Sequence, residues 1–157
     1  MKTVTLDVNG KSFCLDVPDG ELLIETLRDR LGLLGTKYSC LEGDCGVCTV
    51  LADGKNVLSC LILTVEAEGR KITTIEGLAQ GSSLHPIQQA FIDEGAVQCG
   101  FCTPGMILAS KSLLDACPSP TEEEVIGALD GNLCRCTGYV RIVNAVLSAA
   151  RKMKKTP

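Results

Sequence analysis

Ten cysteines are the residues of this 157-residue chain most able to do chemistry, and eight of them fall into two sets. The first set has the spacing C-x4-C-x2-C-x11-C and consists of Cys40, Cys45, Cys48 and Cys60. The second joins a C-x2-C pair to a C-x-C pair and consists of Cys99, Cys102, Cys134 and Cys136. Thiolates in groups of four are typical ligands of structural zinc ions and of iron-sulfur clusters. We expect one metal centre from each set.

Two details favour iron-sulfur clusters, although the residues alone leave zinc open. The C-x4-C-x2-C spacing with a distant fourth cysteine is that of plant-type iron-sulfur loops, and a C-x-C pair is unusual for zinc. Gly43 and Gly46 lie inside CLEGDCGVC. They would let backbone N–H groups approach bridging sulfides closely. A structural or binding module stapled by two zinc ions is the alternative from a different class of protein.

The other polar candidates predict no catalytic acid, base or nucleophile. His85, the single histidine, begins a helix before Pro86 and is expected to lie at the surface or cap that helix rather than bind metal, since a Rieske-type cluster needs two histidines. Arg135 lies between Cys134 and Cys136, where it could offset cluster charge or face a partner or solvent. The LEGDCG segment lacks the lysine of a nucleotide-binding loop. The carboxylates of Glu42, Asp44 and Glu68 lie in polar loops, so we expect them to be solvated.

Cys14 and Cys117 stand outside both sets. Cys14 lies in an alternating stretch and Cys117 precedes a proline, so both are expected to be small buried hydrophobes.

Composition narrows the class of protein. A formal charge of −4 and a pI near 5.0 argue against nucleic acid, because phosphate binding needs clustered Lys and Arg. The one basic run, RKMKKTP at 151–157, is interpreted as a solvated, frayed end. No apolar run is long enough to span a membrane, and MKTVTLDVNGKSF does not resemble an export signal. The expected location is the cytoplasm, where disulfides are rare, which favours metal or redox roles for the cysteines.

The N-terminal half predicts strands and one helix. Asn9-Gly10 and Asp53-Gly54 are type I′ hairpin signals between alternating segments. Leucines at helical spacing follow Pro18, and this helix should stop at Gly32. The pattern indicates an α+β unit with one helix on a small mixed sheet. The expected elements are strands at 4–8 and 12–17, a helix at 20–32, a hairpin around 53–54 and a last strand near 71–78.

The C-terminal half switches to helical periodicity and contains a weak internal repeat. Thr121 and Glu124 form a capping box at the start of one helix. EGAVQCGFCTPGMIL and DGNLCRCTGYVRI both run from a glycine through a cysteine pair, a threonine and a glycine into an amphipathic helix. Two such units across an approximate two-fold axis would gather the second cysteine set near helix N-termini, where an anionic centre is favoured. The expected helices lie within 85–95, 104–117, 121–131 and 138–152.

Four segments between residues 35 and 139 carry a family resemblance: GTKYSCLEGDCGVCTVL, SCL, VQCGFCTPGMI and GNLCRCTGY. In order and separation they resemble the small iron-sulfur subunit of the molybdenum hydroxylases, the group of xanthine dehydrogenase, aldehyde oxidoreductase and carbon monoxide dehydrogenase. Ser39 stands where this family usually has Gly, and Val47 where Ala is usual. Both departures are small changes within the first cysteine loop.

The resemblance implies two domains, each with one [2Fe-2S] cluster. Residues 1–78 would form a ferredoxin-like β-grasp domain whose cluster is held by Cys40, Cys45, Cys48 and Cys60. Residues 79–157 would form an all-α four-helix bundle with pseudo-two-fold symmetry. Its cluster would be held by Cys99, Cys102, Cys134 and Cys136.

The resemblance also implies an electron-transfer subunit of an oxidoreductase complex. Electrons would leave a molybdopterin-type molybdenum cofactor on a large subunit and pass through the helical-domain cluster and then the ferredoxin-like cluster. They would reach FAD on a third, medium subunit, in a dimer of heterotrimers. Gln98 would hydrogen-bond the pterin, and Cys136 would be the cluster ligand nearest to it. By the same resemblance, the segment GAVQCGFC favours a purine such as xanthine or another N-heterocycle as the substrate of the complex. The alternative is the small subunit of an aldehyde or carbon monoxide dehydrogenase.

Overall fold

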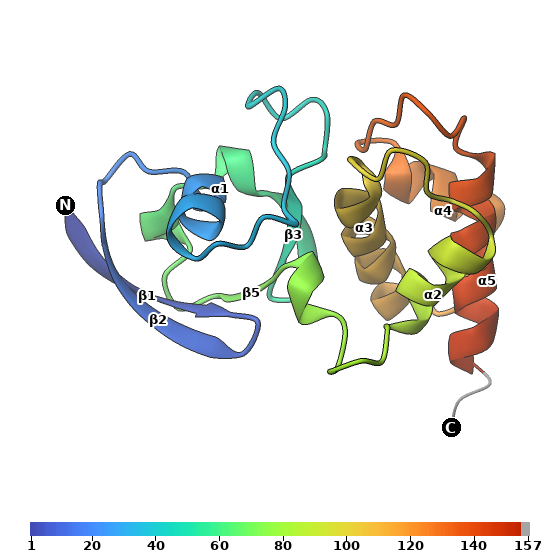
Figure 1. Ribbon diagram of the computed structural model, residues 1–157, viewed down its shortest axis with the longest axis horizontal. Coiled ribbons are helices and arrows are strands. Elements are labelled where there is room, and N and C mark those ends of the chain that lie inside the picture. Colours follow the sequence, from blue (N-terminus) through green and yellow to red (C-terminus); the bar gives the residue numbers. More distant parts are fainter. Residues whose placement is uncertain (155–157) are drawn as a thin grey trace.

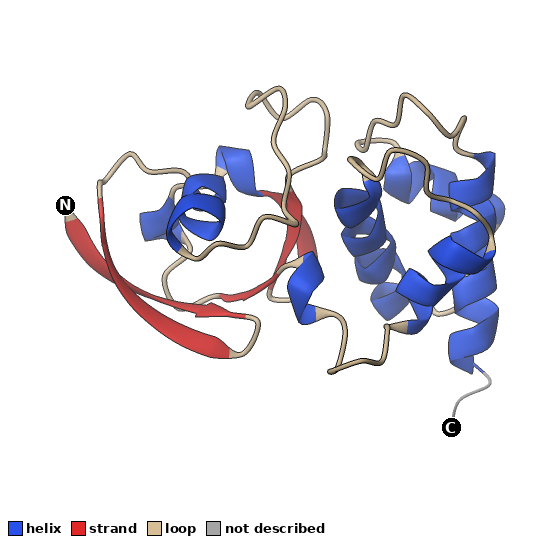
Figure 2. Cartoon of the chain, viewed as in Figure 1, coloured by secondary structure: helices blue, strands red, loops and turns tan. Residues whose placement is uncertain are grey.

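A computed structural model describes residues 1–154 of the chain. Its N-terminal half is a mixed five-stranded sheet with a short helix on one face, and its C-terminal half is helical (Figures 1 and 2). The strands are β1 (Lys2–Val8), β2 (Lys11–Val17), β3 (Thr49–Ala52), β4 (Lys55–Leu58) and β5 (Lys71–Thr73). The helices are α1 (Leu23–Glu25), α2 (Pro86–Asp93), α3 (Thr103–Ala116), α4 (Glu122–Leu129) and α5 (Val140–Lys154). The α+β expectation is confirmed as a mixed sheet plus helices.

The sheet has the order β2-β1-β5-β3-β4. Strands β1 and β5 pair in parallel, whereas the other neighbours pair antiparallel. Both predicted hairpins are confirmed, because Asn9 and Gly10 in one turn and Asp53 and Gly54 in the other all have positive φ.

The last strand is shorter than predicted. Strand β5 ends at Thr73, and Ile75–Gly77 form a 3-10 turn. The Thr74 N–H donates to Asn9 Oδ1 at 2.9 Å, and Asn9 Nδ2 donates to Thr74 Oγ1 at 3.0 Å. The Asn9 side chain therefore occupies the Thr74 N–H, which a continuing strand would need for its pairing.

Helix α1 lies between the sheet and the first cysteine set. It continues as a π-helical turn over Thr26–Arg30, and Gly32, with a φ of 68°, ends it as predicted. Leu23 and Leu27 are fully buried in the core of the sheet. Ile24, on another side, packs with Cys48 and Cys60. Because the helix packs against both the sheet and these two cysteines, it fixes the cysteines relative to the sheet.

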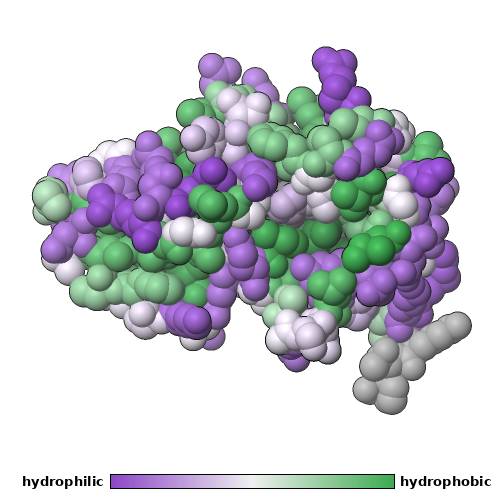
Figure 3. Space-filling view, in the orientation of Figure 1, coloured by the Kyte–Doolittle hydropathy of each residue, from purple (hydrophilic) through white to green (hydrophobic). Residues whose placement is uncertain are grey.

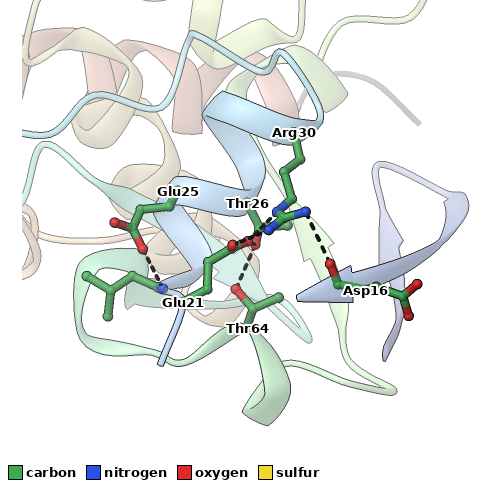
Figure 4. A network of polar contacts seen from close by, with 7 residues as sticks. Asp16, Glu21, Glu25, Thr26, Arg30 and Thr64 are labelled. Atoms are coloured by element: carbon green, nitrogen blue, oxygen red, sulfur yellow. Dashed lines mark hydrogen bonds and ion pairs between the residues drawn. The ribbon is translucent and has the colours of Figure 1, made fainter. Parts of the chain in front are cut away.

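A polar network fixes the start of this helix (Figure 4). Arg30 binds Glu21 through two hydrogen bonds, from Nε at 2.7 Å and from Nη2 at 2.6 Å, and also donates to the Asp16 carbonyl at 3.1 Å. The Thr26 hydroxyl contacts Glu21 and lies 2.7 Å from the Thr64 hydroxyl. The hydrogen bond from Arg30 is the main cause that lowers the pKa of Glu21. These contacts tie α1 to β2 and to the segment before β5.

The four C-terminal helices share one apolar core. Phe91, Met106 and Ile142 are almost completely buried in it, and α5 contacts α2, α3 and α4. The core continues into the N-terminal half through Val47 and Leu51, because α3 packs against β3 (Figure 1). The approximate two-fold symmetry stays a prediction.

The capping box at the start of α4 is confirmed. The Glu124 N–H donates to Thr121 Oγ1 at 3.2 Å, and the Thr121 N–H donates to Glu124 Oε2 at 2.7 Å.

Three sequence predictions are corrected, those for Cys14, Cys117 and the start of the basic run. Cys14 is exposed, because Phe13 and Leu15 point their side chains toward the core and Cys14 shares the opposite face of β2 with Asp16. Cys117 is half-buried. The basic tail is helical over residues 151–154, since α5 extends to Lys154, and residues 155–157 lie outside the described part of the chain.

Within residues 1–154 no helix combines the length and apolar character needed to cross a bilayer. Hydrophobic residues reach the surface over both halves on the face drawn in Figure 3, between hydrophilic ones.

Candidate metal centres

The first cysteine set is assembled by the loop between α1 and β3 and by the 3-10 turn Ser59–Leu61 that follows β4. Cys40 Sγ lies 3.2 Å from Cys45 Sγ. The Cys48 and Cys60 thiols also contact each other, and both residues are buried. The four thiols are therefore arranged as two pairs, of which Cys40 and Cys45 are half-buried and Cys48 and Cys60 are buried.

Local hydrogen bonds and burial act in opposite directions on this set. The backbone N–H groups of Glu42 and Cys45 each lie 3.4 Å from Cys40 Sγ, and they lower the pKa of that thiol to about 6. Burial, followed by the contact with Cys48, raises the pKa of Cys60 to about 11. A buried thiol such as Cys60, whose pKa is raised, fits a site where bound metal supplies the positive charge that a thiolate needs.

Two glycines of the first cysteine loop are required by its backbone conformation and by its packing, as well as for a close approach to a cluster. Gly43 and Gly46 both have positive φ, 88° and 69°. A Cβ on Gly46 would lie 2.1 Å from the Gly131 carbonyl oxygen, in the C-terminal half. Gly46 is thus required where the two halves touch, a role that the sequence did not indicate.

The second set lies at the N-terminal ends of α3 and α5. Cys102 directly precedes α3, and the C-x-C pair lies in the loop before α5. Cys136 Sγ lies 3.5 Å from Cys99 Sγ, and the Cys102 and Cys134 thiols contact each other. Cys99 and Cys136 are exposed, whereas Cys102 is buried. Cys134 is half-buried, so this set also divides into a more exposed and a less exposed pair, and its outer pair is more exposed than that of the first set.

Cys134 is supported by its neighbours. Its N–H donates to the Tyr139 hydroxyl at 2.8 Å, and its Sγ lies 3.0 Å from Thr137 Oγ1. Burial acts to raise the pKa of Cys134, but the Thr137 hydroxyl and the backbone N–H groups of Cys136 and Thr137 outweigh it and bring the pKa to about 7. Burial raises the pKa of Cys102 to about 12. Tyr139 was not singled out from the sequence, and its place in the motif GNLCRCTGY was the available signal.

The pairing of the thiols discriminates between the two kinds of metal centre. A structural zinc ion needs four ligands that converge tetrahedrally on one point. A binuclear iron-sulfur cluster has two irons, so its four thiolates divide into two pairs. The observed pairs fit a binuclear cluster better than a zinc staple.

The two cysteine loops contact each other directly. The Leu133 N–H donates to the Cys45 carbonyl at 2.9 Å, so the residue before Cys134 of the second set is hydrogen-bonded to a proposed ligand of the first. Asn132 is buried, and its Nδ2 donates to the Gly46 carbonyl at 2.8 Å and lies 3.2 Å from Thr49 Oγ1. The sequence predicted two sites but gave no indication of this junction.

The remaining candidates lie near the surface. Gln98 is exposed and directly precedes Cys99, whose Sγ lies 3.5 Å from Cys136 Sγ. His85 caps α2 as predicted, because its Nδ1 accepts the Ile87 N–H at 3.3 Å. Burial is the main cause that lowers the pKa of His85. Arg135 is exposed, and the exposed carboxylates of Glu42 and Asp44 agree with solvated side chains. Glu68 is exposed but also bound, because its Oε2 lies 3.2 Å from Lys2 Nζ and its Oε1 accepts the Thr5 N–H at 3.4 Å.

Both halves match known domain families. Residues 6–75 match the family described as a 2Fe-2S iron-sulfur cluster binding domain, and residues 74–147 match the [2Fe-2S] binding domain. These matches favour iron-sulfur clusters in this chain over the zinc alternative.

Whole-chain relatives define the class of protein. The chain is 50% identical to the nicotine 6-hydroxylase small subunit of Paenarthrobacter nicotinovorans, over 93% of this chain and 88% of the relative. It is 47% identical to the xanthine dehydrogenase iron-sulfur-binding subunit of Escherichia coli O157:H7, over 96% of each chain. These are iron-sulfur subunits of oxidoreductase complexes. The chain belongs to the family of small [2Fe-2S] subunits of the molybdenum hydroxylases.

Solved structures agree with this family. A chain of quinoline 2-oxidoreductase from Pseudomonas putida 86 superposes with a TM-score of 0.94 at 42% identity, over 99% of this chain and 97% of that one. The aldehyde oxidoreductase of Desulfovibrio desulfuricans ATCC 27774 gives the same TM-score at 45% identity, but the match covers 98% of this chain and only 17% of the relative. In that protein the equivalent region is one part of a much longer polypeptide.

Proposed function

We propose that this chain is the electron-transfer subunit of a molybdenum-containing hydroxylase that oxidises an N-heterocycle. The observation that carries the proposal is the presence of two thiol sets, each divided into two pairs, on loops that are hydrogen-bonded to each other. When bound, two [2Fe-2S] clusters would supply one-electron redox chemistry between a molybdopterin-type cofactor on a large subunit and FAD on a medium subunit.

The residues of this chain would bind the two clusters and adjust their reduction potentials, and none would act as a catalytic acid, base or nucleophile. Cys40, Cys45, Cys48 and Cys60 would hold one cluster, and Cys99, Cys102, Cys134 and Cys136 the other. The N–H groups of Glu42 and Cys45 point at Cys40 Sγ, and the Thr137 hydroxyl contacts Cys134 Sγ. Such hydrogen bonds to cluster sulfurs stabilise the more negative state and so raise a reduction potential.

The exposed pair Cys99 and Cys136 is the candidate contact with the large subunit. Both thiols are at the surface, and Gln98 is exposed next to them. An amide can donate to and accept from a pterin edge, so Gln98 would orient the cofactor while Cys136 lies nearest to it. Both roles are carried over from the family.

Three finer proposals accompany this one. The two domains would meet at residues 78 and 79, the complex would be a dimer of heterotrimers, and its location would be the cytoplasm. An N-heterocyclic substrate is supported by the names of the nicotine, xanthine and quinoline relatives, and the aldehyde relative keeps an aldehyde as the alternative.

The test uses the complex purified anaerobically with its large subunit. Xanthine, nicotinate and an aldehyde are offered in turn, and the visible absorption of the iron-sulfur clusters is followed. We expect an N-heterocycle to bleach it, Cys136→Ser to abolish this bleaching, and the matched Cys14→Ser variant to behave as the wild type. The electron-transfer role would be contradicted if dithionite reduced the clusters but no substrate of a catalytically active complex did.

A further inference from the structure

An apolar groove of about 490 Å³ runs between α4, α5 and the loop that joins them. Ile126, Leu133 and Val140 line it and are 51%, 53% and 67% exposed. Leu129 and Val143, which also line it, are buried in the helical core. Large apolar side chains gathered around a concavity mark an interaction site, because single scattered ones would not form a continuous surface.

The groove borders the second cysteine set. Leu133 directly precedes Cys134, and Tyr139 lines the groove while its hydroxyl accepts the Cys134 N–H. Whatever occupies the groove therefore contacts the residue that supports a proposed cluster ligand. Gly138, which also lines the groove, lies two residues after the exposed Cys136 in the chain.

The rim of the groove is acidic. Glu122 and Asp130 line it, and Glu123 and Glu124 lie in the same first turn of α4. A second copy of this chain packed on the same groove would bring these carboxylates together, which is unfavourable. A segment with apolar side chains and flanking Lys or Arg is complementary to both features.

We propose that this groove seats such a segment of the large subunit, beside the second cluster. The inference rests on the proposed function, because it takes its partner from it. The groove supplies the buried apolar anchor of the interface, and its acidic rim selects a basic flank on the partner. Seating this segment would also exclude water from Tyr139, which lines the groove and whose hydroxyl accepts the Cys134 N–H.

Two matched variants test the assignment. Ile126→Asp places a charge in the groove, and Ile92→Asp places one on α2 at a comparably exposed isoleucine, 59%, outside the groove. Each variant is purified with its clusters, its iron content is checked, and its affinity for the purified molybdenum-containing subunit is measured by biolayer interferometry. We expect Ile126→Asp to weaken binding by about tenfold or more, and Ile92→Asp by less than about twofold.

The rim is tested by Glu122→Lys, which should slow association and weaken its dependence on salt. Unchanged binding by Ile126→Asp, or an equal loss in both isoleucine variants, would overturn the groove assignment while leaving the electron-transfer role intact. A dimer of the isolated chain that Ile126→Asp dissociates would also overturn it, in favour of a second copy. Wild-type protein without iron would instead refute the proposed function.

Discussion

Replacing Gly46 by alanine should uncouple the two halves of the chain. The new Cβ would lie 2.1 Å from the Gly131 carbonyl oxygen and 2.9 Å from Asn132 Cα, and these are backbone atoms that cannot rotate away. The φ of 69° at Gly46 adds roughly 1–2 kcal/mol for a residue with a Cβ. Overpacking of a close contact costs about 1–3 kcal/mol more. We expect a total loss of about 2–5 kcal/mol in the free energy of unfolding.

The assay is thermal unfolding followed by circular dichroism and by visible absorption at one fixed scan rate, because cluster loss makes the transition irreversible. For a chain of this size about 1 kcal/mol corresponds to roughly 2–4 °C, so the transition should fall by at least about 4 °C. Gly131→Ala is the matched control, since a Cβ there meets nothing within 4 Å. A Gly46→Ala transition within about 1 °C of the wild type, or an equal drop in the control, would refute this reasoning.

Two further predictions concern the supports of the first cysteine loop. Arg28 donates to the carbonyls of Leu34 and Thr36 at 3.1 and 2.6 Å and lies 4.9 Å from the Tyr38 ring centroid, so Arg28→Ala should loosen the segment that leads into Cys40. Iron should then be lost to a chelator several times faster, whereas Tyr38→Phe, which keeps the ring, should lose iron at the wild-type rate. Glu21→Gln should destabilise the protein by about 1 kcal/mol at neutral pH, because a two-bonded Arg-carboxylate pair at the surface is worth about that much. The pKa of Glu21 is lowered from 4.5, so the stability difference between wild type and Glu21→Gln should be fully present above pH 4.5 and vanish as the pH falls through the lowered pKa. Thermal unfolding of both proteins across this pH range measures the difference. A stability difference that grows on acidification would contradict the assignment.

Local sequence signals predicted most of the secondary structure. The Asn9-Gly10 and Asp53-Gly54 turns were readable because two consecutive left-handed residues demand such dipeptides. The capping box at Thr121 was readable because both of its partners lie within one helical turn. The grouping of the cysteines into two sets followed from their spacing along the chain.

Features that depend on distant residues were not readable. Strand β5 ends early because the Asn9 side chain, far away in the sequence, binds Thr74. Cys14 was expected inside because alternation alone does not say which of the two faces meets the core. The junction of Gly46 with Asn132, and the division of each cysteine set into pairs, both arise from tertiary packing.

The central claim is that this chain carries two binuclear iron-sulfur clusters, and the most direct test is the metal and sulfide content of anaerobically purified protein together with its visible spectrum. We expect about four irons and about four acid-labile sulfides per chain, with absorption that dithionite bleaches. A colourless protein that contains about two zinc ions and no labile sulfide would contradict the claim.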